Sequence, residues 1–99
     1  MKIWVSGQDR GESAEAWLLK AEEKLKEQGH FVASCRLLME LRAFEPEDLA
    51  HIRRGFIDAC DAVYFLKDWK GSKECVKDYY YAKEWRKEIL WEDESTKGE

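Results

Sequence analysis

The chain contains little of what stabilises small secreted domains or binds polyanions. It has only three cysteines and two histidines, with no Cys-x-x-Cys pair, so we expect neither a disulfide framework nor a metal site. Its formal net charge of −4 argues against binding to a nucleic-acid polymer, because such binders carry a basic excess. No apolar run approaches the roughly 18 residues of a membrane span. We therefore expect a cytoplasmic protein with no membrane contact and no cofactor.

The residues that are present predict one α/β domain. Hydrophobic residues make up 44% of the chain, which suits a globular protein with one modest core. Short apolar runs alternate with segments of helical periodicity, and this alternation predicts a parallel sheet with right-handed crossovers. Residues 35–45 fit either a short helix or a loop packed on the sheet. Strands are expected at 2–6, 31–33, 61–66 and 88–91, helices at 14–28, 46–59 and 72–85, and the domain at 1–92 with a polar, frayed tail at 93–99.

The helical periodicity also predicts which side chains face the core. Ser13 and Ser72 are expected as N-caps, and Gly29 as the residue that follows the end of the first helix. Arg53 and Arg54 are expected on an exposed helix face. The side chains expected to point inward are Ala14, Trp17, Leu18, Ala21 and Leu25 in the first helix, Leu49, Ile52, Phe56 and Cys60 in the second, and Cys75, Val76, Tyr79 and Ala82 in the third.

The segment from Asp61 to Trp91 contains the candidate site. A strand that ends near Leu66 leads into a polar loop, and Ser72 then starts a helix whose second turn carries Asp78. Ligands of parallel α/β sheets bind in the loops after the carboxyl ends of strands. A helix N-terminus in such a loop presents free N–H groups to an anion. The sequence therefore predicts a ligand site that combines an anion-binding position with an acidic group.

Four stretches of the chain follow a known pattern. They are K-I-W-V-S-G at the N-terminus, Gly29-His30 before the second strand, C-D-A-V-Y at the third strand, and W-K-G-S-K-E-C-V-K-D-Y-Y-Y-A beginning at Trp69. The last of these aligns without a gap to the motif W-x-x-S-x-G-A-x-x-E-x-x-x-A. Over residues 2–92 the chain resembles the DUF4406 family, which belongs to the nucleoside 2-deoxyribosyltransferase-like superfamily.

The resemblance implies a flavodoxin-like three-layer α/β/α sandwich with a four-stranded parallel sheet in the order 2-1-3-4. It also implies an enzyme that cleaves an N-glycosidic bond, either a nucleoside 2-deoxyribosyltransferase or a deoxynucleoside 5′-monophosphate N-glycosidase. In that chemistry a carboxylate attacks the anomeric carbon and the base leaves, and Asp78 takes the position of the nucleophile. The substrate-binding positions implied are Ser6, Gly7, Gln8, Trp69 and Ser72.

Three positions depart from the family motif. Asp78 replaces its glutamate, which places the carboxylate roughly 1.5 Å further back. Glu74 replaces its glycine, and Cys75 replaces its alanine. A second function therefore stays open, a catalytically degenerate nucleotide-binding or protein-interaction module of the same fold. In that case Asp78 is an acid on an exposed helix face, and Trp69, which otherwise stacks on a base, packs across the end of the sheet.

An aromatic-rich region lies near the C-terminus. Tyr79, Tyr80 and Tyr81 cannot all face inward, because successive helical residues are about 100° apart. Together with Trp85 and Trp91, they fit either core packing with partial exposure or a homo-oligomer contact. The resemblance implies the second, because members of that superfamily often form dimers and larger assemblies. The expected partners are thus a nucleoside or nucleotide and a second copy of the chain.

Overall fold

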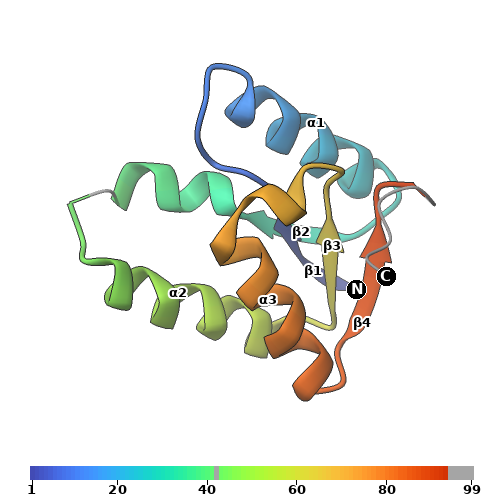
Figure 1. Ribbon diagram of the computed structural model, residues 1–99. Coiled ribbons are helices and arrows are strands. Elements are labelled where there is room, and N and C mark those ends of the chain that lie inside the picture. Colours follow the sequence, from blue (N-terminus) through green and yellow to red (C-terminus); the bar gives the residue numbers. More distant parts are fainter. Residues whose placement is uncertain (42, 94–99) are drawn as a thin grey trace.

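The computed structural model describes residues 1–41 and 43–93. Its strands are β1 (Lys2–Ser6), β2 (Phe31–Ser34), β3 (Ala62–Phe65) and β4 (Glu88–Trp91). All pairs are parallel, and the four strands form one sheet in the order β2-β1-β3-β4 (Figure 1). The register aligns Trp4 with Ala33 on one side and Val63 on the other. The predicted fold class and strand order are confirmed.

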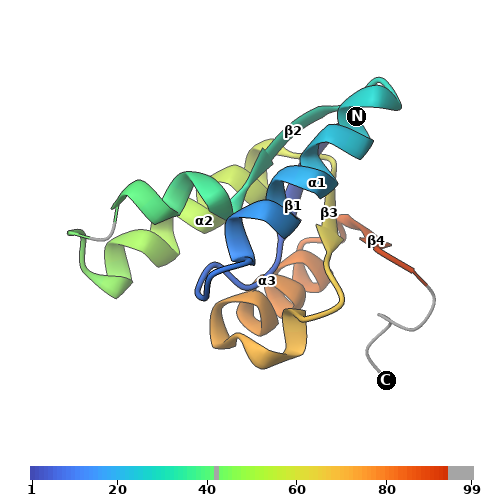
Figure 2. The same ribbon diagram turned by 90° about the horizontal axis from the view of Figure 1, so that it is seen from above.

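Helices cover both faces of this sheet. They are α1 (Ala14–Glu27), α2 (Pro46–Ala59) and α3 (Lys73–Glu84), with short 3-10 helices η1 (Cys35–Leu41) and η2 (Trp69–Gly71) between them. α1 lies on one face, while α2 and α3 lie side by side on the other (Figures 1 and 2). The segment left open between a helix and a loop is therefore helical through Leu41.

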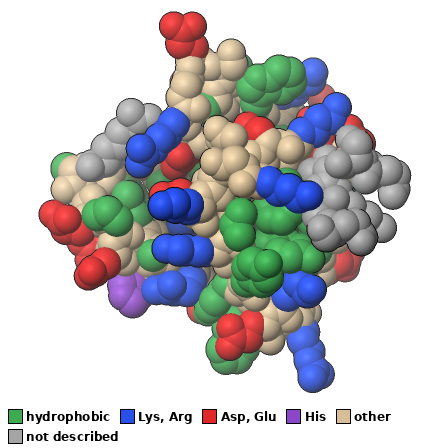
Figure 3. All heavy atoms as spheres, in the orientation of Figure 1, with side chains coloured by type: hydrophobic (Ala, Val, Ile, Leu, Met, Phe, Trp, Pro, Cys, Tyr) green, Lys and Arg blue, Asp and Glu red, His purple; other side chains and the backbone are tan. Residues whose placement is uncertain are grey.

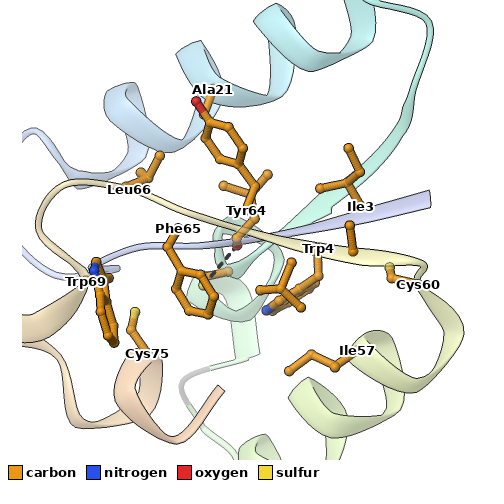
Figure 4. Packing of buried hydrophobic residues seen from close by; sticks show 14 of the residues in the cluster. Ile3, Trp4, Ala21, Ile57, Cys60, Tyr64, Phe65, Leu66, Trp69 and Cys75 are labelled. Carbon is orange, nitrogen blue, oxygen red and sulfur yellow. Dashed lines mark hydrogen bonds between the residues drawn. The ribbon is translucent and has the colours of Figure 1, made fainter. Parts of the chain in front are cut away.

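The core has two halves, because successive strand residues point to opposite faces of the sheet. Ile3, Tyr64 and Leu66 lie on the α1 side, where the Tyr64 ring points toward Ala21 (Figure 4). On the other side, Trp4 and Phe65 lie with Ile57, Trp69 and Cys75 (Figure 4). Strands buried on both faces explain why the sequence shows short continuous apolar runs rather than alternation.

Two predictions about helix faces are wrong. Trp17 was expected in the core but is 52% exposed, because its side chain lines an open cavity with Leu66 and Lys67. Arg53 was expected on an exposed face but is only 5% exposed, because it pairs with a buried acid. The other inward positions are buried or half-buried as predicted.

The end of the described chain is held to the sheet. Lys67 Nζ lies 2.9 Å from Asp93 Oδ2, and the Glu92 backbone N–H donates to the Phe65 carbonyl. The rest of the predicted frayed tail, 94–99, lies outside the described residues. Within the described part of the chain, no helix is both long and apolar enough to cross a membrane.

Candidate functional site

The loops after β1 and β3 meet at the carboxyl edge of the sheet. Gly7 is buried, and a Cβ at this position would lie 2.6 Å from Leu66 Cδ1, so only glycine allows this approach. Beside it, Gln8 donates from its backbone N–H to Asp68 Oδ1 (3.3 Å) and from Nε2 to the Asp68 carbonyl (3.0 Å). These contacts join the two loops that the sequence predicts to form the site.

A cavity of about 260 Å³ opens between the two loops. Gln8 and Ser72, both predicted to bind substrate, line it, whereas Ser6, Gly7, Trp69 and Asp78 are not among its lining residues. The complete lining is Gln8, Asp9, Arg10, Gly71, Ser72, Lys73 and Glu74. A Cβ on Gly71 would collide with the Gln8 amide. Two of the six predicted site residues thus line the cavity, and the predicted nucleophile does not.

The start of α3 already holds a negative charge. Ser72 is the N-cap, as predicted: its Oγ accepts the Cys75 backbone N–H (3.3 Å) and donates to Glu74 Oε2 (3.2 Å). The backbone N–H of Glu74 is the largest influence that lowers the pKa of its carboxyl, and Ser72, Arg53 and Arg10 act in the same direction. Glu74 thus occupies the helix N-terminus at which an anionic ligand would otherwise be favoured.

Asp78 is buried and hydrogen-bonded on both oxygens. Its Oδ1 accepts Arg53 Nε (3.1 Å), and its Oδ2 accepts Arg53 Nη2 (2.6 Å). Oδ2 also accepts the hydroxyl of Ser6 (2.8 Å) and Nε1 of Trp4 (3.3 Å). The carboxylate is 4% exposed. Asp78 is therefore neither the exposed acid of one interpretation nor a group that faces the cavity.

The Arg53 side chain holds this arrangement together from α2. Burial by itself lowers the pKa of the guanidinium, but the influence of Cys35 and the hydrogen bonds and charge of Asp78 outweigh it, so the pKa rises. Arg53 is thus a permanent cation facing a carboxylate at hydrogen-bond distance. Such two-point pairing fixes the carboxylate in one orientation.

Trp69 packs across the end of the sheet, as one of its two interpretations predicts. It is 4% exposed, and its ring centroid lies 5.2 Å from Phe65, 5.0 Å from Tyr79 and 5.7 Å from Trp91. A ring enclosed in this way has no open face for a nucleobase. Tyr80, by contrast, is 64% exposed, which confirms that the three tyrosines do not all face inward.

Basic side chains gather locally although the net charge is −4. Figure 3 shows Lys and Arg side chains in a row beside a patch of hydrophobic side chains. At the cavity, Arg10 and Lys73 contribute positive charge, while Asp9 and Glu74 contribute negative charge. Such a lining suits a small ligand with both donors and acceptors better than a polyanion.

Sequence reasoning missed Arg53 and Trp4 as partners of Asp78. A usable signal existed for Arg53, because it lies four positions after Leu49 and four before Ile57, on the apolar stripe of α2. The sequence gave no such signal for Trp4. The N–H of a buried tryptophan needs an acceptor, but the sequence does not show which residue provides it. A second cavity, of about 210 Å³ and lined by Trp17, Leu66, Lys67, Asp68 and Glu92, was not predicted.

The described residues form an α/β fold with a cavity at the carboxyl edge of a parallel sheet and a buried Arg–Asp pair. A family model described as Domain of unknown function (DUF4406) matches residues 1–91, and the chain belongs to this family. This confirms the family part of the resemblance. No curated protein and no solved structure matches the chain.

Proposed function

We propose that the chain is a nucleoside-binding domain that does not cleave the glycosidic bond, a narrower form of the catalytically degenerate nucleotide-binding or protein-interaction module considered from the sequence. The observation that carries the proposal is the ion pair between Asp78 and Arg53, 2.6 Å at its closest. A carboxylate nucleophile must have a free oxygen lone pair and must lie in a near-attack geometry toward the anomeric carbon. Asp78 instead accepts four hydrogen bonds from neighbouring side chains.

The cavity supports a ligand of the nucleoside class. Its position at the carboxyl ends of β1 and β3 is where parallel α/β sheets bind small molecules. The Gln8 amide and the charged groups of Arg10, Lys73 and Glu74 supply donors and acceptors that match sugar hydroxyls and the polar edges of a base. The volume of about 260 Å³ suits a small molecule rather than a polymer.

Glu74 favours a nucleoside over its 5′-monophosphate. A phosphate at the start of α3 would meet the Glu74 carboxylate, which already interacts with the backbone N–H there and with Ser72. Two like charges in this position repel each other. The proposed ligand is therefore uncharged at its 5′ position.

Titration calorimetry with 2′-deoxynucleosides and their 5′-monophosphates tests this proposal. We expect the nucleoside to bind more tightly, and Glu74→Gln to improve monophosphate binding by about tenfold because it removes a like charge. Glu84→Gln is the matched control, since Glu84 is the exposed last residue of the same helix. Absence of binding by both ligand types, or a monophosphate preference that ignores Glu74, would overturn the proposal.

An active N-glycosidic-bond enzyme is the second candidate. Two observations favour it: the contact between Ser6 and Asp78 (2.8 Å), and the intact spacing from Trp69 to Ala82. It requires Arg53 to release Asp78 when substrate binds. This candidate predicts free base from a deoxynucleoside, with loss of that activity in Asp78→Asn.

A further inference from the structure

Two buried thiols lie against the same guanidinium group. Cys35 is the first residue of η1 and Cys75 lies in the first turn of α3, and both side chains are 0% exposed. Nη2 of Arg53 lies 3.4 Å from Cys35 Sγ and 4.0 Å from Cys75 Sγ. One nitrogen atom of Arg53 therefore lies close to two sulfur atoms that belong to different elements of the fold.

The surroundings of the two thiols are unequal. The Cys35 thiol donates to the Val5 carbonyl (3.3 Å). The influence of each cysteine on the other is the largest one: it lowers the pKa of the Cys75 thiol and raises that of the Cys35 thiol. Burial raises the pKa of both thiols and Arg53 lowers that of both, whereas Asp78 further raises the pKa of Cys35. Cys75 thus has the character of an attacking thiol and Cys35 that of a resolving thiol.

Cys60 provides an internal comparison. It is also buried, at 8% exposure, and it lies at the end of α2. Burial and the nearby Asp61 raise its pKa, although Lys87 and Lys2 act in the opposite direction. It has neither a thiol partner nor an arginine among the contacts of the described residues. The chain therefore contains one thiol pair and one isolated thiol of similar burial.

We propose that Cys35 and Cys75 are a redox pair that a hydroperoxide converts into a disulfide. The Cys75 thiolate attacks a peroxide oxygen, the O–O bond breaks, and a sulfenic acid forms while hydroxide leaves and takes up the thiol proton as water. The Cys35 thiol then attacks the sulfenic sulfur, the S–S bond forms, and a second water leaves. In total, two thiols and one hydrogen peroxide give one disulfide and two waters, so the two electrons that the thiols lose reduce the peroxide.

The bond would connect η1 to the first turn of α3. That turn carries Glu74, and Ser72 directly before it caps the helix through the Cys75 N–H. The oxidised form would therefore hold the α3 side of the cavity against η1. This inference does not depend on the proposed nucleoside function.

Peptide mapping after hydrogen peroxide treatment tests the proposal. Trypsin places each cysteine in its own peptide: 27–36 for Cys35, 55–67 for Cys60 and 74–77 for Cys75. Reduced protein is treated with hydrogen peroxide, unfolded, alkylated with iodoacetamide and digested. We expect peptides 27–36 and 74–77 to be crosslinked within one chain, while peptide 55–67 carries the alkyl group. Free thiols at Cys35 and Cys75, oxidation of both to sulfinic acid, or a crosslink that includes Cys60 as readily would overturn the proposal.

Variants and stability provide the controls. Cys60→Ala should keep the crosslink and Cys75→Ala should lose it, with circular dichroism used to confirm that each variant is folded. Because the bond closes a long loop in the unfolded chain, the oxidised wild type should show a Tm about 10 °C higher than the reduced form. A crosslink that lowers the Tm would show that it forms only in distorted protein, and would contradict the proposal.

Discussion

At the scale of single residues, the buried pair of Arg53 and Asp78 governs the site. Burying a carboxylate and a guanidinium costs several kcal/mol per ion unless the geometry is good and the remaining hydrogen-bonding groups are satisfied. Here the guanidinium of Arg53 donates two hydrogen bonds to the carboxylate of Asp78, and Ser6 and Trp4 each donate one more to that carboxylate. Removing one partner leaves the other charge buried without compensation.

Substitution of Asp78 should therefore destabilise the fold. We expect Asp78→Asn to lower the free energy of unfolding by about 3 kcal/mol, because Arg53 keeps its charge and loses its counter-ion. Urea denaturation checks this value. The double variant Arg53→Met/Asp78→Leu, which removes both charges, should lose less than the single variant. If Asp78→Asn is as stable as the wild type, Asp78 is not the counter-ion described here.

At the scale of elements, short polar contacts fix where helices begin and how they are tied to the sheet. At the N-terminus of α3, the Ser72 hydroxyl accepts a backbone N–H, whereas the equivalent Ser13 before α1 makes no side-chain cap hydrogen bond. Between α1 and η1, buried Glu22 accepts Ser34 Oγ (2.7 Å) and Arg36 Nε (2.7 Å). A serine before a helix thus contributes to stability in different amounts, depending on whether its side chain makes the cap hydrogen bond.

The two caps can be compared directly. Ser72→Ala should lower the free energy of unfolding by about 1 kcal/mol, because a backbone N–H at the start of α3 loses its acceptor. Ser13→Ala should change stability by only a few tenths of a kcal/mol, since no cap bond is lost. Thermal or urea denaturation of both variants measures the difference. Equal effects would contradict the capping role of Ser72.

Glu22 should make stability depend on pH in the acid range. Burial raises the pKa of its carboxyl, but hydrogen bonds from Arg36 and Ser34 outweigh burial, so the pKa in the folded state lies below 4.5. The stabilisation is therefore complete above about pH 4.5 and is lost as the pH falls through the folded pKa.

Paired stability measurements check this expectation. The stability difference between wild type and Glu22→Gln should be largest near neutral pH and should shrink as the pH is lowered from about 4.5 towards 3, because the unfolded carboxyl takes up its proton before the folded one. Glu23→Gln, a neighbour with an exposed side chain, should show little difference at either pH. A Glu22→Gln difference that does not change between these pH values would be incompatible with the pairing.

At the scale of the whole molecule, strand order, parallel pairing and the Ser72 cap could be predicted because they depend on local patterns and general crossover rules. The meeting of Gln8 and Ser72 at one cavity follows from the same rules, since strand ends share an edge. The link between Arg53 and Asp78 could not be read in this way. It depends on how α2 and α3 rotate against each other, and local periodicity only places Arg53 on an apolar stripe.

The most direct test of the central claim, that Asp78 serves as the counter-ion of Arg53 and not as a nucleophile, is the release of free base from a bound 2′-deoxynucleoside. Calorimetry first establishes saturation, and liquid chromatography then follows the base in the same sample. We predict a release rate equal to that of the deoxynucleoside without protein. Release well above that rate, lost in a folded Asp78→Asn variant, would contradict the account.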